Sequence, residues 1–121
     1  MDWKKAFGDR EEIILATCSK SGNPRIIAVI SLGFHKNKLL IGICQMKKSF
    51  ENLKHNKNVS LAALDKGKYY YAASGKCEIY SSGEYFDITM EKSKGDDIIP
   101  HHVLVVDIKE VFDLDNVKKV F

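Results

Sequence analysis

The sequence predicts a mainly β protein: a six-stranded antiparallel barrel with two or three short helices. Apolar, β-branched segments recur at short spacing, turn-forming residues lie between them, and the segments with helical spacing are short. This combination favours an antiparallel barrel over a parallel sheet. With 121 residues, the chain is expected to form one domain over residues 1–121, with no room for a second.

Six segments have the composition of β-strands. The turn formers at residues 19–24 predict a hairpin between the first two, and residues 33–38 and 65–68 predict further turns. Gly75 lies inside the fifth segment, where a glycine predicts a bulge or a bend. The expected strands cover residues 13–18, 25–32, 39–44, 59–64, 69–80 and 103–112.

Helical spacing is confined to short segments. A first helix is expected over residues 2–7, with Asp2 as its cap, and Trp3 is expected to cover one end of the barrel. A helix over residues 84–93 would turn one face toward the core, formed by Tyr85, Ile88 and Thr89.

The remaining helix, over residues 47–56, carries chemical information. Ser49 is predicted to cap its N-terminus and Asn56 to end it. The first turn of a helix has free N–H groups and a partial positive charge, and Lys47 and Lys48 add further donors. This combination suits a phosphate group. A solvated lysine pair before a capped helix explains the segment equally well.

Charge is unevenly distributed along the chain. The net charge is +3, but residues 35–76 carry nine lysines against two acids, and residues 77–121 carry five lysines against ten acids. The basic middle suits an anionic ligand. Because no RNA-reading or helix-turn-helix signature accompanies it, we expect no nucleic-acid partner.

The sequence predicts a cytoplasmic protein. No run approaches the ~18 apolar residues of a membrane span, and the N-terminus lacks the apolar stretch of a signal peptide. Cys18, Cys44 and Cys77 are odd in number and widely separated, so we expect reduced and mostly buried thiols.

Several enzyme signatures are absent from the sequence. It contains no glycine-rich dinucleotide loop, Walker loop, C-x-x-C pair or nucleophile elbow. His101 and His102 are adjacent, and adjacent strand residues point to opposite faces, so we expect them not to share a metal ion. They are expected to open the last strand at its exposed end.

Short motifs follow one another in a fixed order from residue 13 onward. They lie at residues 14–17, 21–24, 25–30, 39–42, 47–49, 52–53, 56–61 and 71–79. This ordered set resembles the pyridoxamine 5′-phosphate oxidase-like family of flavin-binding split barrels. The resemblance implies a six-stranded split barrel that forms a homodimer and binds FMN in a groove at the dimer interface.

The resemblance also implies which residues contact FMN. The matching positions are Lys47, Lys48 and Ser49 at the phosphate, Gln45 and Met46 near the ring or ribityl chain, the backbone of Ile27, Ala28 and Val29 beside the ring, Asn52 near the phosphate or ribityl chain, and Tyr70 or Tyr71 of the partner subunit. Arg25 fits two interpretations equally well, a phosphate ligand or a charge beside a turn.

The chain departs from the full-length oxidases of that family, which use arginines for FMN and substrate. Here lysines stand at the phosphate turn and the chain has two arginines, so the resemblance supports FMN binding more strongly than the oxidase reaction. The leading hypothesis is an FMN-dependent oxidoreductase with an unknown small-molecule substrate and no identified catalytic residue. One alternative is a non-catalytic flavin or haem binding or sensing protein, and another is a barrel without cofactor. Histidines available for haem are His35, His55, His101 and His102.

Overall fold

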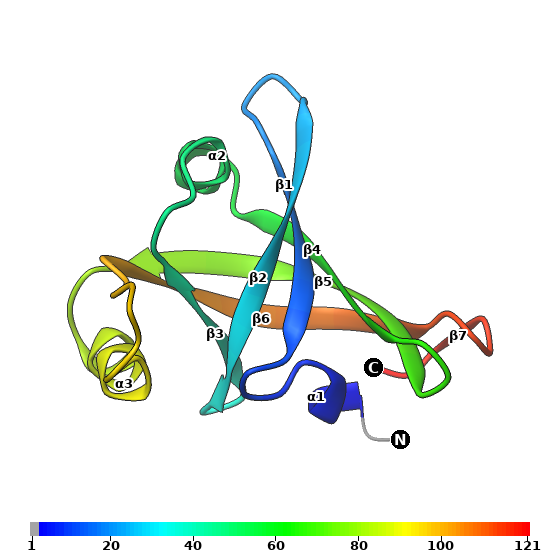
Figure 1. The fold of residues 1–121 in the computed structure, drawn as a ribbon. Helices are drawn as coiled ribbons and strands as arrows, with labels where there is room; N and C mark the ends of the chain where they lie inside the picture. The colour runs from blue at the N-terminus through cyan, green and yellow to red at the C-terminus, as the bar shows by residue number, and fades with distance from the viewer. Residues whose placement is uncertain (1–2) are drawn as a thin grey trace.

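The computed structural model describes residues 3–121, which form a barrel with three short helices (Figure 1). The predicted six-stranded antiparallel barrel is confirmed, and the sequence does not predict the additional strand β7. In chain order the elements are α1 (Trp3–Ala6), β1 (Glu12–Cys18), β2 (Pro24–His35), β3 (Lys38–Ile43), α2 (Lys48–His55), β4 (Asn58–Asp65), β5 (Tyr69–Tyr80), α3 (Glu84–Lys92), β6 (His102–Asp113) and β7 (Lys118–Lys119).

The barrel closes because β3 pairs with β6. The strand order is β3-β2-β1-β4-β5-β6, neighbouring strands are antiparallel, and β7 extends the sheet beyond β6. Inward and outward side chains alternate along the strands. In β1, Ile13 and Leu15 are buried, whereas Ile14 and Ala16 are partly exposed. Aliphatic side chains such as Leu61 fill the interior.

β2 has two different neighbours along its length. Its first half pairs with β1, and from Ser31 onward it pairs with β3. A bulge between Ser31 and Phe34 marks the change of neighbour. Gly33 lies in this bulge with a φ of 79°, a value that glycine adopts without strain.

The turn after β2 is shorter than the sequence predicts. The expectation of a turn from residue 33 is wrong, because the bulge lets β2 continue to His35. The chain reverses instead at Lys36 and Asn37, which have φ values of 51° and 65°. Two consecutive residues at positive φ are typical of the tight turns that match the twist of a β-hairpin.

Gly75 marks a second bulge, as predicted. The register between β5 and β6 shifts between Ser74 and Gly75. A Cβ atom at Gly75 would lie 2.3 Å from the carbonyl oxygen of Asp107, which is closer than carbon and oxygen approach without a bond. The two strands can therefore approach this closely only where a side chain is missing.

The start of α2 differs from the prediction. Ser49 is not the N-cap: the helix begins at Lys48, and Lys47 occupies the cap position without a side-chain hydrogen bond. Ser49 is buried, and so is Leu53 one turn later. Packing of Leu53 in the core fixes the rotation of the helix and carries Ser49 inward with it. Asn56 ends the helix, as predicted.

The other two helices cover separate parts of the barrel (Figure 1). Tyr85 and Ile88 of α3 pack against a buried cluster of β2, β3 and β6 residues, and Thr89 is fully buried, as predicted. Trp3 of α1 packs against the main core, while its predicted cap, Asp2, lies outside the described residues. Within residues 3–121, no helix has the length and apolar character needed to cross a membrane.

We predict that Gly75→Ala destabilises the protein strongly. The added methyl group clashes with the Asp107 carbonyl, and we expect the free energy of unfolding to fall by about 3 kcal/mol, as for severe overpacking. Chemical denaturation measures this loss. Gly67→Ala is the control: its φ is positive, unlike that of Gly75, and no described atom lies within 4 Å of the added Cβ, so we expect a loss of about 1 kcal/mol from backbone strain alone. Equal losses in the two variants would contradict the steric explanation.

Candidate functional site

A groove opens beside β2 where this strand leaves β3. One cavity of about 520 Å³ is lined by the first half of β2, the chain that follows β3 and the loop between α3 and β6. A second cavity of about 410 Å³ adjoins it, because Ile27, Gln45 and Met46 line both. We term the two together the β2 groove. Each volume lies within the range of small-molecule sites, roughly 300–1,000 Å³.

An unpaired strand edge forms one wall of the β2 groove. Residues 24–30 of β2 pair with β1 on one side, whereas β3 pairs with β2 only from Ser31 onward. The backbone N–H and C=O groups on the open edge are therefore available to a ligand. Ile27 and Val29 line the groove at this edge and give it an apolar surface.

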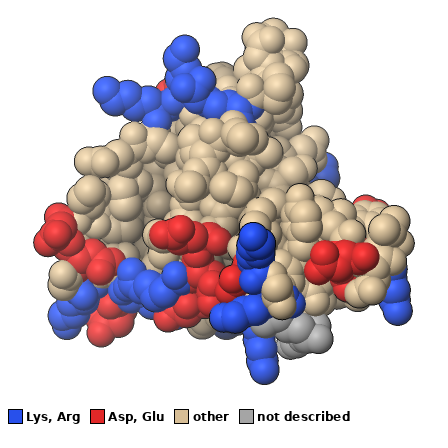
Figure 2. Space-filling view, turned by 45° about the vertical axis from the view of Figure 1, so that its right-hand side comes forward, with Lys and Arg blue, Asp and Glu red and all other residues tan. Residues whose placement is uncertain are grey.

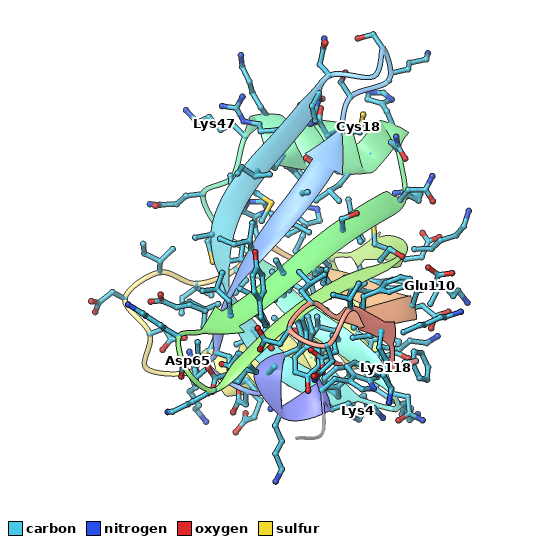
Figure 3. The ribbon with its side chains drawn as sticks, turned by 90° about the vertical axis from the view of Figure 1, so that its right-hand side faces the viewer. Lys4, Cys18, Lys47, Asp65, Glu110 and Lys118 are labelled. Carbon is cyan, nitrogen blue, oxygen red and sulfur yellow. The ribbon has the colours of Figure 1, made fainter. Side chains whose placement is uncertain are left out.

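The end of the β2 groove nearest α2 is basic. Arg25, Lys47, Lys48 and Ser49 line it. Because no side chain caps α2, the N–H groups of its first turn are left without a partner inside the helix, and the helix dipole adds positive charge there. In Figure 3, Lys47 lies toward the same end of the molecule as the tip of the β1–β2 hairpin.

The hydroxyl group of Ser49 is an unpaired polar group at this basic end. Ser49 is 2% exposed, and its Oγ has no hydrogen-bond partner among residues 3–121. A buried hydroxyl left without a partner costs about 1–3 kcal/mol, so such groups in native proteins call for an explanation. A ligand that accepts a hydrogen bond at this end of the groove supplies one.

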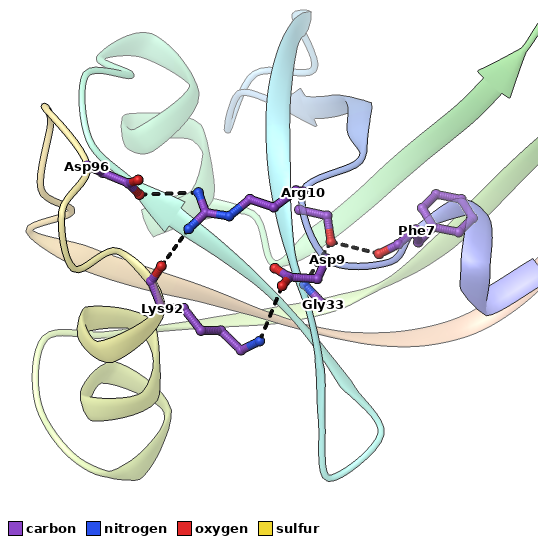
Figure 4. Close-up of polar contacts among 7 residues, drawn as sticks. Phe7, Asp9, Arg10, Gly33, Lys92 and Asp96 are labelled. Carbon is purple, nitrogen blue, oxygen red and sulfur yellow. Dashed lines mark hydrogen bonds and ion pairs between the residues drawn. The ribbon is translucent and has the colours of Figure 1, made fainter.

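An ion pair lies at the other end of the β2 groove (Figure 4). Nη1 of Arg10 is 3.2 Å from Oδ2 of Asp96, and Nη2 of Arg10 donates to the carbonyl oxygen of Lys92. The backbone of Arg10 has a φ of 70°, and its N–H donates to the carbonyl oxygen of Ser31 at 2.8 Å. These contacts hold the guanidinium group between β2 and the chain that follows α3.

Cys44 lies in the wall of the groove between its two ends. Burial and, to a smaller extent, the negative charge of Asp96 raise the pKa of the Cys44 thiol. The Cys77 thiol is in the core, where burial raises its pKa to about 11. Cys18 is half-buried at the end of β1, and none of the three forms a disulfide. The thiol in the groove is therefore protonated and weakly nucleophilic at neutral pH.

The structure brings most of the residues matched to FMN into the β2 groove. The residues that line it are Ile27, Ala28, Val29, Gln45, Met46, Lys47, Lys48 and Ser49. They come from two short stretches of sequence, one in β2 and one that joins β3 to α2. Arg25, for which the sequence left two interpretations, also lines the basic end.

Asn52 and Tyr70 lie outside the groove of this chain. Nδ2 of Asn52 donates to Oγ1 of Thr17 at 3.1 Å, which ties α2 to β1. Tyr70 is 44% exposed on the outer face of β5, opposite Leu64 of β4. A second subunit is needed for Tyr70 to reach a cofactor, as the sequence prediction already assumes.

The histidine pair is arranged differently from the prediction. The expectation that the two rings point apart is wrong, because His101 precedes β6 and is not held in its alternating pattern. The ring centroids are 4.7 Å apart, and both rings contact Phe50 of α2. Burial, His101 and Lys54 lower the pKa of His102. Within residues 3–121 no group of three metal-ligating side chains occurs.

Sequence reasoning missed the residues at the far end of the groove. Arg10, Ser93, Asp96, Ile98 and Pro100 line it, and they come from the loops before β1 and after α3. No motif marks these loops in the sequence, and only the folded barrel brings them together.

Both the sequence and the fold are similar to those of known proteins. The family model described as pyridoxamine 5′-phosphate oxidase matches residues 3–115. No curated protein sequence matches the chain. Among solved structures, HupZ of Group A Streptococcus is similar with a TM-score of 0.89 at 17% identity, over 100% of this chain and 98% of that chain.

Two further solved structures differ in the cofactor that their descriptions name. An FMN-binding protein from Syntrophomonas wolfei has a TM-score of 0.72 at 17% identity, over 83% of this chain and 74% of that chain. HutZ, a haem storage protein from Vibrio cholerae, has a TM-score of 0.71 at 14% identity, over 99% of this chain and 94% of that chain. At such identities the likeness shows a shared fold.

We predict that Asp96→Asn makes Cys44 more reactive. Removing the carboxylate lowers the pKa of the thiol, so alkylation by iodoacetamide at pH 8 is expected to be faster in the cofactor-free protein. Mass spectrometry of the digested protein gives the rate at each cysteine. Cys18 is the internal control and keeps its rate, and Cys77 stays unmodified while the protein is folded. An unchanged rate at Cys44 would show that the charge of Asp96 does not reach the groove wall.

Proposed function

The chain belongs to the pyridoxamine 5′-phosphate oxidase family, and we propose that it is a homodimeric FMN-binding protein that carries out a redox reaction on a small molecule. The observation that carries this proposal is the unpaired, buried hydroxyl of Ser49 at the basic end of the β2 groove. We also propose a cytoplasmic location, where the three free thiols stay reduced.

The basic end of the β2 groove fits the phosphate of FMN. Lys47 and Lys48 supply positive charge, the uncapped start of α2 supplies N–H donors, and Ser49 supplies a hydroxyl that has no partner within the described chain. Helix N-termini are ready-made anion sites for these reasons. The three kinds of donor converge on one end of the groove, and charge-assisted hydrogen bonds of this type are the strong ones.

The middle of the β2 groove fits a flat aromatic ring. Ile27 and Val29 offer apolar contact, and the open backbone edge of β2 offers donors and acceptors to the polar rim of a ring. Gln45 adds a side-chain amide. FMN supplies two-electron transfer when it is bound, while this chain's residues anchor, orient and polarise it.

An exposed apolar face supports the proposed homodimer. In the middle of β2, β1, β4 and β5 the outward side chains are small or apolar, namely those of Ala28, Ile14, Ala62 and Ala72, and Ile26 and Leu64 are 69% and 57% exposed. Figure 3 shows these strands side by side, and Figure 2 shows a broad uncharged area with charged side chains at its margins. Faces of this kind are typical of protein interfaces. Ile26 and Ile27 are neighbours in β2, so a partner on this face would also border the groove.

Haem is the second candidate cofactor, as in HutZ. His101 and His102 lie together beside Phe50, and a histidine nitrogen is a common axial ligand of haem iron. In that case the protein would be a non-catalytic haem binder. Neither histidine lines the β2 groove, so the two candidates rely on different residues.

We predict that the double variant Lys47→Ala/Lys48→Ala binds FMN on the order of a hundredfold more weakly. Each lysine contributes a charge-assisted contact of about 1.5 kcal/mol or more. Quenching of flavin fluorescence measures the affinity, and riboflavin, which lacks the phosphate, should bind wild type and variant equally.

The control is Lys66→Ala/Lys68→Ala, which removes the same charge from the turn between β4 and β5. That turn follows Asp65, the last residue of β4, which lies at the other end of the molecule from Lys47 (Figure 3). Equal losses in both double variants would show a general charge effect and no phosphate site.

Titration with haemin, followed at the Soret band, tests the second candidate cofactor. Tight haemin binding without flavin binding would replace the first proposal.

We predict that Ala62→Arg converts the protein to a monomer. Ala62 lies opposite Ile14 on one side and Ala72 on the other, in the middle of the apolar face, so a buried arginine there has no partner. Light scattering after gel filtration gives the mass. Ile99→Arg, in the loop between α3 and β6, is the control and should leave the mass unchanged. A wild-type mass of one chain would refute the dimer.

A further inference from the structure

We infer that Arg10 and Asp96 form an electrostatic pair that sets the reduction potential of a flavin bound in the β2 groove. The inference rests on the proposed function, and it assigns a role to two residues that lie far from the phosphate end. In this assignment Arg10 stabilises the reduced flavin, and Asp96 destabilises the reduced flavin.

The placement of the two charges carries the inference. Among residues 3–121, the charged side chains that line the 520 Å³ cavity are those of Arg10 and Asp96. The same cavity is lined by Ile27 and Val29 on the open edge of β2, where a ring would lie. A ring seated there is therefore close to one positive and one negative group. Their side chains are 49% and 39% exposed, and a ring that covers them excludes water, so that their charges act on it more strongly than in water.

The guanidinium group of Arg10 is held in place from several sides (Figure 4). Its two Nη atoms bond to Asp96 and to the Lys92 carbonyl, and its backbone N–H bonds to the Ser31 carbonyl. Nζ of Lys92 in turn lies 3.9 Å from Oδ2 of Asp9. A charge held in this way keeps its position when the neighbouring ring changes charge. Charges fixed in position are the ones that shift the reduction potential of a cofactor effectively.

The field of Asp96 reaches the groove wall. After burial, Asp96 is the group that raises the pKa of the Cys44 thiol, because it disfavours a second negative charge nearby. Cys44 lines the groove together with Gln45 and Met46. A negative charge that develops on a ring in the same cavity is opposed by Asp96 for the same reason.

The charge of the flavin depends on its redox state. Two-electron reduction by an added chemical reductant takes up two electrons and one proton, so a neutral ring system becomes one with a single negative charge at neutral pH. Nearby charge tunes the electronics of a bound flavin. A cation near the ring stabilises the reduced form and raises the potential, whereas an anion lowers it.

The test compares the potential of bound FMN in wild type and four variants, measured by dithionite titration against a reference dye. Arg10→Gln should lower the potential and Asp96→Asn should raise it. Each shift is expected to correspond to a tenfold change in the equilibrium between oxidised and reduced FMN, about 30 mV for a two-electron couple. Arg10→Lys keeps the charge and should keep most of the potential. The matched control is Glu84→Gln, which breaks an ion pair with Lys36 outside the groove.

Opposite shifts in the two charge variants support the inference. Shifts in the same direction, or unchanged potentials with FMN still bound, would overturn it, because a loosened groove affects both variants alike. If Arg10→Gln does not fold, Asp96→Asn and Arg10→Lys decide the matter: a potential unchanged by Asp96→Asn, or lowered fully by Arg10→Lys, overturns the inference. If wild type binds no FMN, the proposed function itself fails, and this result is distinct from FMN bound with unchanged potentials.

Discussion

The change of partner within β2 is the constraint on which the barrel, the groove and the proposed site all depend. At this point Ser31 is fully buried; its Oγ donates to the carbonyl oxygen of Phe7 at 2.7 Å and accepts from the N–H of Gly33 at 2.9 Å. These bonds satisfy polar groups that would otherwise be buried in the core without a hydrogen-bond partner. They also hold the bulge that turns β2 from β1 toward β3. Because the strand switches neighbours there, its first half keeps an open edge, and that edge is a wall of the groove.

The same point orients both ends of the groove. The carbonyl oxygen of Ser31 accepts the N–H of Arg10, so the bulge also positions the cation at the far end. At the near end, the core packing of Leu53 fixes the rotation of α2 and directs its uncapped first turn toward the groove. The result is a site that is basic at one end, apolar in the middle and balanced in charge at the other. This sequence of environments suits an elongated ligand with a phosphate at one end and a ring at the other.

The sequence predicts the strands well because barrel strands alternate apolar and polar residues, a local signal. The family resemblance also points to groove residues in two short stretches of sequence, one around Ile27 and one around Lys47. Sequence reasoning fails where distant contacts decide the local structure. Ser49 looks like a cap, yet the packing of its neighbours buries it inside the first turn. The turn expected at residue 33 is a bulge. The hydroxyl of Ser31 stabilises the continuation of β2 there by a hydrogen bond to the carbonyl oxygen of Phe7, which is distant in sequence. Arg10 and Asp96 leave no local signal, since their positions follow from the closed barrel.

The two candidate cofactors place different demands on the same helix. The flavin proposal uses the first turn of α2, where Lys47, Lys48 and Ser49 face the β2 groove. The haem proposal uses Phe50, which contacts both His101 and His102. The fold shared by the FMN-binding and haem storage proteins is therefore compatible with both proposals, and the polar groups supply an argument for the first. The hydroxyl of Ser49 lacks a partner within the described chain, whereas the two histidines already bond to each other through their Nδ1 atoms. An unsatisfied group at a built cavity calls for a ligand more strongly than a satisfied pair outside it, and this difference favours the flavin.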